Sequence, residues 1–127
     1  MASTFLGLRT VIYHVSDLKA AKEWYASATG VAPYFDEPFY VGFNIGGFEL
    51  GLDPNPNAGK SGMGGTTVYW GAPNADEAVA RLIAAGATAG AAVTEVGEGI
   101  RVGTVLDPFG NEIGVIENPE FKPEDVR

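Results

Sequence analysis

Two side chains in this sequence have types and positions suited to chemistry, His14 and Glu49. His14 is the only histidine and ends a run of alternating residues; because imidazole titrates near neutral pH, it could transfer a proton or contact a ligand. Glu49 stands between Phe48 and Leu50, where a carboxylate could act as a general base or anchor a cationic or hydroxyl-bearing ligand. The structural alternatives are a strand-end histidine bonded to backbone or water, and a carboxylate on the wet face of a strand. The roles of both residues therefore depend on which way their strands face.

Cysteine is absent from the 127 residues. This excludes a disulfide framework, thiolate metal ligands and a cysteine nucleophile, and is typical of a reducing compartment. With one histidine, imidazoles cannot assemble a metal site either. The glycine-rich run from Gly59 to Gly65 contains a Lys-Ser pair but lacks the spacing of a phosphate-binding loop and precedes a predicted strand. We interpret it as a flexible loop that could cover a cavity.

The chain is strongly acidic. It has eight Lys and Arg residues and sixteen Asp and Glu residues, so its net charge is −8, and the basic residues form no cluster. This charge disfavours nucleic acid and anionic membranes as partners. The acidity could attract a cationic ligand, or serve only solubility. No apolar run reaches the roughly 18 residues that span a bilayer, and the N-terminus lacks a basic region followed by an apolar stretch. We expect a cytoplasmic protein whose partner is a small molecule.

The first half of the chain predicts a βαβββ unit. Alternation over residues 8–15 indicates a strand, and Ser16 or Asp17 can cap the helix that follows. Trp24 and Tyr25 match the apolar stripe of this helix and are expected in the core between helix and sheet. Three more strands are expected at 34–37, 40–45 and 48–53.

The second half repeats this order. A strand is expected at 66–71, then a helix capped by Asn74 and ended by Gly86. Further strands are expected at 91–96, 100–106 and 112–116. The sequence thus predicts one α+β domain over residues 1–118, with repeats at about 6–53 and 66–118, a linker at 54–65, and a C-terminal tail at 119–127.

Short motifs recur in a recognisable order along nearly the whole chain. They are Val15-Ser16-Asp17-Leu18, Trp24-Tyr25, Thr29-Gly30, Ala84-Ala85-Gly86 and Leu106-Asp107-Pro108-Phe109-Gly110-Asn111. This pattern resembles the vicinal oxygen chelate superfamily, which groups glyoxalase I, extradiol dioxygenases, fosfomycin-modifying enzymes and bleomycin-binding resistance proteins. The resemblance implies two βαβββ repeats whose curled mixed sheets surround a cavity, within one chain or across the interface of a homodimer, which we expect here.

The resemblance also implies where a divalent metal would bind. In the family, the first strand of each repeat provides His or Gln and the last provides a carboxylate; these positions fall on Thr10, Glu49, Thr67 and Gly114. Only Glu49 keeps a ligand-type side chain, and one carboxylate with two hydroxyls would leave a metal mostly hydrated. We expect no cofactor and no metal. The alternative is an oxygen-rich site for Mg²⁺ drawn from Glu49, Asp53, Glu112 and Glu117.

Strand alternation then selects the residues expected to bind a ligand. Side chains two and four positions after Thr10 share its inward face, and the same rule applies to the other strands. The expected ligand-binding set is Thr10, Ile12, His14, Glu49, Thr67, Tyr69, Glu112 and Gly114. Alternation places Glu117 on the outer face, exposed or pairing with the tail.

Two functions fit these residues best. The loss of three metal positions favours a metal-free protein that sequesters an organic ligand, cationic or aromatic, as the bleomycin-binding members do. The alternative is a lactoylglutathione lyase-like lyase or isomerase with Glu49 and His14 as its catalytic acid/base residues, with or without a divalent metal. An interaction module without a ligand would leave the inward polar residues unexplained.

Overall fold

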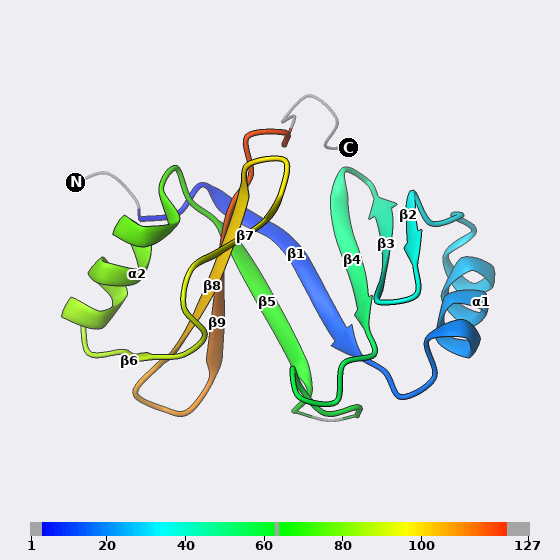
Figure 1. Cartoon of the computed structure of the whole chain (residues 1–127), viewed down its shortest axis with the longest axis horizontal. Coiled ribbons are helices and arrows are strands. Elements are labelled where there is room, and N and C mark those ends of the chain that lie inside the picture. Colours follow the sequence, from blue (N-terminus) through cyan, green and yellow to red (C-terminus); the bar gives the residue numbers. More distant parts are fainter. Residues whose placement is uncertain (1–3, 63, 122–127) are drawn as a thin grey trace. The chain divides into compact units, whose positions relative to one another are not determined.

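The computed structural model describes residues 4–62 and 64–121, which form helices and strands in the order of an α+β fold (Figure 1). Their contacts divide them into two compact units. The N-terminal unit comprises residues 10–62 and 64–67, and the C-terminal unit comprises residues 4–9 and 68–121. None of the described helices is long and apolar enough to span a bilayer.

The N-terminal unit has one helix and a sheet whose strands follow the order β2-β3-β4-β1. Its elements are β1 (Gly7–His14, from Thr10 onward in this unit), α1 (Leu18–Thr29), β2 (Phe35–Glu37), β3 (Tyr40–Ile45) and β4 (Phe48–Asp53). Strands β2, β3 and β4 pair antiparallel, while β1 and β4 pair parallel. The helix returns the chain so that β2 runs in the direction of β1, and two successive hairpins then bring β4 back to that direction. This is the expected βαβββ order.

Helix α1 begins and ends where local chemistry satisfies its free backbone groups. The Asp17 carboxylate accepts a hydrogen bond from the Ala20 amide at 3.0 Å. At the other end Gly30, with φ of 75°, donates its N–H to the Ala26 carbonyl; this left-handed conformation favours glycine. Of the two caps that the sequence offered, Ser16 and Asp17, the structure uses Asp17.

One face of this sheet packs against α1 and forms the core of the unit. Its fully buried members are Val41, Phe43 and Leu52, with partly buried side chains around them from Val15, Leu18, Ala21, Tyr25, Ala26 and Leu50. Tyr25 thus lies in the expected core, but the prediction for Trp24 is wrong, since its side chain is 63% exposed. Neighbouring helix positions differ by about 100° in direction, so only one of the two rings can face the sheet.

The C-terminal unit contains the second helix and the remaining strands. They are β5 (Thr66–Gly71, from Val68 onward in this unit), α2 (Ala75–Ala84), β6 (Thr88–Ala89), β7 (Thr94–Gly97), β8 (Ile100–Leu106) and β9 (Glu112–Glu117). Strand β9 pairs parallel with β5 and antiparallel with β8. The core of this unit lies under α2 and contains Ala72, Ala75, Ala78 and Val115.

The single strand expected at 91–96 is instead two short strands, β6 and β7, both paired with β8. Two residues between these strands share Thr104 of β8 as their partner. The Gly90 amide donates to the Thr104 carbonyl and the Thr104 amide donates to the Ala91 carbonyl, each at 3.0 Å, while the Ala91 amide donates to the Thr104 hydroxyl at 2.8 Å. Two residues opposite one interrupt the regular ladder, as at a β-bulge.

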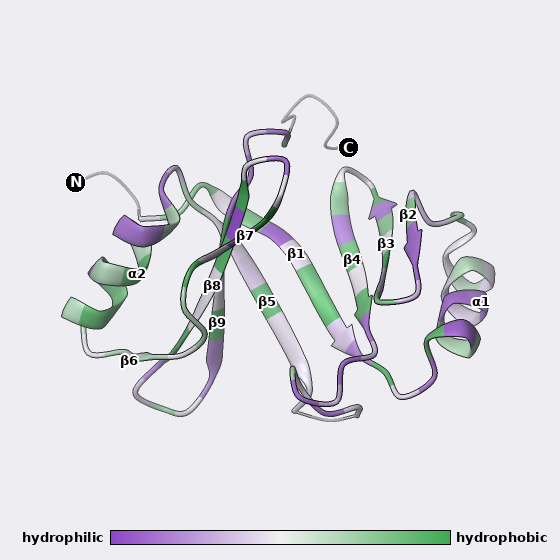
Figure 2. Ribbon diagram, in the orientation of Figure 1, coloured by the Kyte–Doolittle hydropathy of each residue, from purple (hydrophilic) through white to green (hydrophobic). Residues whose placement is uncertain are grey.

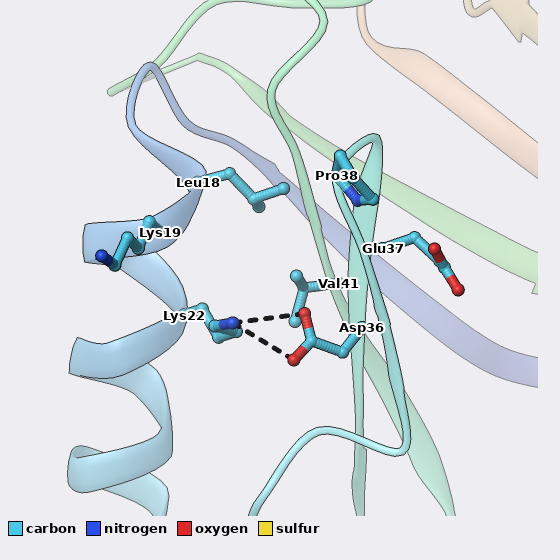
Figure 3. A pocket seen from close by; sticks show the side chains of 7 residues that line it. All are labelled: Leu18, Lys19, Lys22, Asp36, Glu37, Pro38 and Val41. Atoms are coloured by element: carbon cyan, nitrogen blue, oxygen red, sulfur yellow. Dashed lines mark hydrogen bonds and ion pairs between the residues drawn. The ribbon is translucent and has the colours of Figure 1, made fainter.

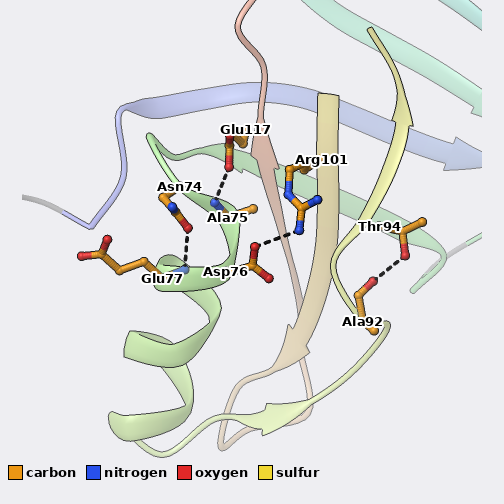
Figure 4. A network of polar contacts seen from close by, with 8 residues as sticks. All are labelled: Asn74, Ala75, Asp76, Glu77, Ala92, Thr94, Arg101 and Glu117. Atoms are coloured by element: carbon orange, nitrogen blue, oxygen red, sulfur yellow. Dashed lines mark hydrogen bonds and ion pairs between the residues drawn. The ribbon is translucent and has the colours of Figure 1, made fainter. Parts of the chain in front are cut away.

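Figure 4 shows how the start of α2 is tied to the strands beneath it. Asn74 accepts a hydrogen bond from the Glu77 amide at 2.9 Å, as its predicted role as helix cap requires. Glu117 of β9 accepts a second one, from the Ala75 amide at 2.8 Å. Arg101 of β8 bonds Asp76 of α2 at 2.8 Å. Glu117 is therefore half-buried at the helix start, and the expectation that it is exposed or pairs with the tail is wrong.

The tail enters the described residues only as far as Phe121. The Arg9 guanidinium lies 3.7 Å from the centroid of the Phe121 ring, a cation–π contact inside the C-terminal unit. Residues 122–127 lie outside the described residues.

Candidate functional site

The face of the N-terminal sheet opposite α1 carries the polar residues that the sequence singled out. Because Val41, Phe43 and Leu52 face the helix, the side chains that alternate with them point the other way. We call this side of the sheet the open face. The strand register assigns to it Thr10, Ile12, His14, Phe35, Glu37, Tyr40, Gly42, Asn44, Glu49, Gly51 and Asp53. Three of them are acidic, and none is Lys or Arg. In Figure 2 the hydrophilic colour covers much of β2 and recurs along β4.

Glu49 lies at the centre of this arrangement, beside Thr10 of β1. Its two carboxylate oxygens are held by different tyrosines: the Tyr34 hydroxyl donates to Oε1, and the Tyr40 hydroxyl donates to Oε2. Both donors are neutral, so they orient the carboxylate without supplying a compensating positive charge. We call Tyr34, Tyr40 and Glu49 the tyrosine clamp.

Two glycines make room for the clamp. A Cβ atom at Gly51 would overlap the Tyr40 hydroxyl, so the ring of Tyr40 crosses the strand only because Gly51 has no side chain. A Cβ at Gly42 would lie 3.3 Å from Glu49 Oε1 and 3.4 Å from Tyr34 Cε1, tighter than ordinary contact. The small residues therefore shape the site as much as the polar ones do.

Proximity to Glu49 changes the acidity of Tyr34. Removal of the hydroxyl from water raises the pKa of Tyr34 far above its ordinary value, and the hydrogen bond to Glu49 and the charge of that carboxylate raise it further. Tyr34 is therefore a phenol, a hydrogen-bond donor, at physiological pH.

Aromatic rings extend the site toward solvent. Tyr34 is 62% exposed and Phe39 is 66% exposed. The Phe35 ring contacts those of Phe39 and Tyr40, with centroids 6.0 and 6.1 Å apart respectively. A carboxylate beside exposed aromatic faces is suited to a ligand that is both positively charged and apolar.

His14 is buried, with 7% of its surface exposed. Its Nε2 lies 3.4 Å from the Thr67 hydroxyl, whereas Nδ1 has no hydrogen-bond partner in the described structure. The backbone of Gly59 lies against the imidazole so closely that a Cβ there would overlap the ring. The linker is therefore packed on β1 at this point.

The structure does not bring His14 and Glu49 together. Register pairs His14 with Asp53 and Glu49 with Thr10, four positions away along the same strands. Four residues of a strand span about 13 Å. Of the predicted ligand-binding residues in this unit, Thr10 and Glu49 are adjacent, Ile12 is half-buried beside Gly51, and His14 and Thr67 form a second, buried pair.

The other predicted residues lie in the C-terminal unit. Tyr69 pairs with Gly114 in register, and a Cβ at Gly114 would lie 2.6 Å from Tyr69 Cδ1. The Tyr69 ring thus occupies the space above Gly114. Glu112 is exposed at the start of β9, opposite Leu106.

The donors at the four metal positions that the family resemblance implies do not fit a divalent ion. Both Glu49 oxygens accept tyrosine hydroxyls, Thr10 and Thr67 offer weak hydroxyl ligands, and Gly114 offers none. Nowhere in residues 4–62 and 64–121 do three His, Asp or Glu side chains gather as a metal site would require. The proposed Mg²⁺ alternative also loses Glu117, which caps α2.

Glu49 lines neither of two clefts in the described part of the N-terminal unit. The larger, about 460 Å³, lies between α1 and the β2–β3 hairpin, where Figure 3 shows Lys22 reaching across to Asp36. That ion pair, at 3.1 Å, satisfies both charges. The smaller, about 340 Å³, is lined by Tyr13, His14, Val15, Tyr25, Ser61, Gly62, Gly65 and Thr66.

Sequence reasoning missed the tyrosines and glycines of the site. Tyr40 carried a usable signal, because antiparallel pairing of β3 with β4 puts it on the same face as Glu49 and Gly51. Tyr34 carried no such sequence signal, since it precedes β2 and the direction of its side chain depends on the path of the loop. Its amide is fixed by a hydrogen bond to the Gly42 carbonyl at 3.0 Å.

Comparison with solved structures finds this fold in enzymes of low sequence identity. Methylmalonyl-CoA epimerase from Mycobacterium tuberculosis has 18% identity and a TM-score of 0.70, covering 98% of this chain and 93% of that one. A Streptomyces coelicolor methylmalonyl-CoA epimerase in complex with 2-nitronate-propionyl-CoA has 16% identity and a TM-score of 0.72, covering 93% and 98%. The Mn(II)-bound glyoxalase from Novosphingobium aromaticivorans has 21% identity and a TM-score of 0.66, covering 91% of this chain and 40% of that one.

Among curated proteins, no sequence matches this chain significantly. A family model, in contrast, matches residues 7–115, which include every strand and both helices except the last two residues of β9. The fold, the repeat order and this match agree: the chain belongs to the Glyoxalase/Bleomycin resistance protein/Dioxygenase superfamily.

Proposed function

We propose that this protein binds and sequesters a small organic cation with an apolar, aromatic part, and that Glu49 on the open face is its anchor. The observation that carries the proposal is the tyrosine clamp: a carboxylate oriented by two neutral hydroxyls. The proposal needs neither a metal nor a chemical step. It fits a family whose description covers resistance proteins as well as enzymes.

Charge and shape both favour such a ligand. The open face carries Glu37, Glu49 and Asp53 with no Lys or Arg, so a cation gains attraction and an anion is repelled. A cation over an exposed aromatic face gains about 0.5–1 kcal/mol from the ring, and Phe39 offers such a face. Phe35 and Phe39 add apolar surface at the rim.

A matched pair of small probes tests the proposal. Tryptamine is an indole with an ammonium group, and indole-3-propionate has the same ring with a carboxylate. Isothermal titration calorimetry at pH 7 should show tryptamine binding at least about tenfold more tightly, a difference of about 1.4 kcal/mol. Equal affinities for the two probes would contradict electrostatic selection.

Two variants with the same change of charge locate the site. Glu49→Gln should weaken tryptamine binding about tenfold or more, because the amide keeps the shape but loses the charge. Glu23→Gln removes a carboxylate from the exposed surface of α1 and should leave the affinity unchanged. An unchanged affinity in Glu49→Gln would overturn the proposal.

The alternative, a lyase or isomerase with Glu49 and His14 as acid and base, requires a substrate that spans about 13 Å between them. Lactoylglutathione lyase activity that survives chelation but disappears in both Glu49→Gln and His14→Ala would favour it over binding alone. The separation in register is the reason that we rank it second.

The proposal includes a cytoplasmic location, favoured by the absence of cysteine, and a homodimer, implied by the family resemblance. Light scattering after size exclusion separates the 13.3 kDa chain from a particle of twice that mass. A monomer across the micromolar range would contradict the dimer without affecting the binding site.

A further inference from the structure

The two tyrosines of the clamp differ in how firmly they are held. Tyr40 begins β3, is partly buried, and its ring fits the space left by Gly51. Tyr34 lies outside the strands and is 62% exposed. Apart from its hydroxyl bond to Glu49, the Tyr34 residue is anchored through its backbone amide to the Gly42 carbonyl at 3.0 Å.

We propose that Tyr34 is a displaceable donor: the bound ligand replaces the Tyr34 hydroxyl at Glu49 Oε1, while Tyr40 stays on Oε2 as a positioning residue. The proposal rests on the function proposed above and deepens it. It makes Tyr34 a competitor of the ligand within the same site.

This exchange specifies the chemistry of the ligand. Oε1 is a charged acceptor that loses its donor when Tyr34 leaves, and an unsatisfied acceptor beside protein is unfavourable. The ligand must therefore bring an N–H group as well as a positive charge. Primary to tertiary ammonium and amidinium groups meet this requirement, whereas a quaternary ammonium group has charge but no donor.

The geometry also explains why Tyr34 and not Tyr40 leaves. Rotation of the exposed Tyr34 side chain moves its ring into water without disturbing the sheet. Movement of Tyr40 would uncover the backbone at Gly51 and separate its ring from Phe35, 6.1 Å away. The part-buried hydroxyl of Tyr40 therefore keeps the carboxylate in place when Tyr34 moves.

Removal of each hydroxyl separates the two roles. Tyr34→Phe removes the competitor and should tighten tryptamine binding about three- to tenfold, as expected for one hydrogen bond. Tyr40→Phe removes the positioning donor and should weaken binding by a similar factor. Tyr13→Phe, at a tyrosine on the face of β1 that contacts α1, should change nothing.

A second probe tests the donor requirement. The N,N,N-trimethyl derivative of tryptamine keeps the indole and the charge but has no ammonium N–H, and should bind the wild-type protein at least about threefold more weakly. This inference is overturned if Tyr34→Phe weakens binding as Tyr40→Phe does, or if the quaternary probe binds as well as tryptamine.

Failure of this inference differs from failure of the proposed function. If tryptamine binds and Glu49→Gln abolishes binding, but Tyr34→Phe does not tighten it, the carboxylate site stands and the displacement is wrong. If tryptamine binds neither the wild-type protein nor Tyr34→Phe, both proposals are wrong. Circular dichroism of each variant confirms that a lost signal reflects the site and not unfolding.

Discussion

At the scale of single residues, the site consists of one carboxylate and the neutral groups that orient it. Glu49 accepts hydroxyls from Tyr34 and Tyr40, and these donors leave its negative charge uncompensated. An Arg or Lys partner would have neutralised it and left little attraction for a ligand. Phenol donors therefore make an acidic residue rigid while it remains electrostatically active.

Gly51 is expected to be as important as the tyrosines. Gly51→Ala places a Cβ where the Tyr40 hydroxyl lies, so Tyr40 must move and the clamp loses its fixed donor. We expect weaker tryptamine binding and a loss of about 1–3 kcal/mol in the free energy of unfolding by urea, as for other overpacked sites.

A double-mutant cycle isolates this contact. In a Tyr40→Ala background the same Gly51→Ala substitution has no ring to displace and should change stability much less. Equal destabilisation in both backgrounds would show that the alanine acts on the strand itself and not through Tyr40.

Tyr34 should make stability depend on alkaline pH. Its pKa is raised in the folded protein, so the neutral phenol is the form that folding favours. The stability that it contributes is fully present below the ordinary tyrosine pKa of about 10 and is lost as the pH rises above it. Between pH 9 and 11, the urea midpoint should fall more for the wild-type protein than for Tyr34→Phe.

Phenolate absorbance gives an independent check on Tyr34. The wild-type minus Tyr34→Phe difference spectrum should titrate well above pH 10, and in a Glu49→Gln background the same difference should titrate closer to that value, since the carboxylate is one cause of the shift. A titration unmoved by Glu49→Gln would contradict the hydrogen bond.

At the scale of elements, α2 depends on a residue far along the chain. Glu117 of β9 accepts the hydrogen bond of the Ala75 amide, one of the free groups in the first turn of the helix. Glu117→Ala should lower the unfolding free energy by about 1 kcal/mol, the usual effect of losing a cap. Glu117→Gln, which keeps an acceptor oxygen, should lower it less. Thermal unfolding of the two variants checks that Glu117→Ala is less stable than Glu117→Gln.

The expected helices and most strands are confirmed because their signals are local. Asp17 and Asn74 cap the helices as expected, and β3, β4, β5 and β8 have the predicted bounds. The strand expected at 91–96 is wrong: β6 and β7 stand in its place, and between them Gly90 and Ala91 both bond Thr104, which is more than ten residues away. A contact between residues far apart in the sequence cannot be predicted from the pattern of the residues around either one.

The same distinction explains the site. The family resemblance implied that Thr10 and Glu49 face the same site, alternation added Ile12 and His14 to that face, and register pairs Thr10 with Glu49. The contact of Tyr34 with Glu49 depends on the path of the chain before β2, and the packing of His14 under Gly59 depends on a linker with little apolar pattern. Neither follows from alternation.

At the scale of the whole molecule, the net charge of −8 attracts cationic ligands and repels anionic ones before they reach the site. Because salt screens charges beyond about 10 Å at 0.1 M, the affinity for tryptamine should fall as salt rises from about 20 to 300 mM. Calorimetry at both salt concentrations measures the change. Neutral 3-ethylindole serves as control, and an equal loss for this probe would show that salt acts on the fold.

Because His14 is buried, its side chain can report movement of the linker away from β1. The chain has one imidazole, and the backbone of Gly59 covers it. An excursion that lifts Gly59 from β1 removes one of the groups that cover this ring, so the ring's proton resonances and its rate of acylation by diethyl pyrocarbonate should record that excursion without an introduced label. The motion of the chain at Gly59 thereby becomes measurable in one side chain of the unmodified protein.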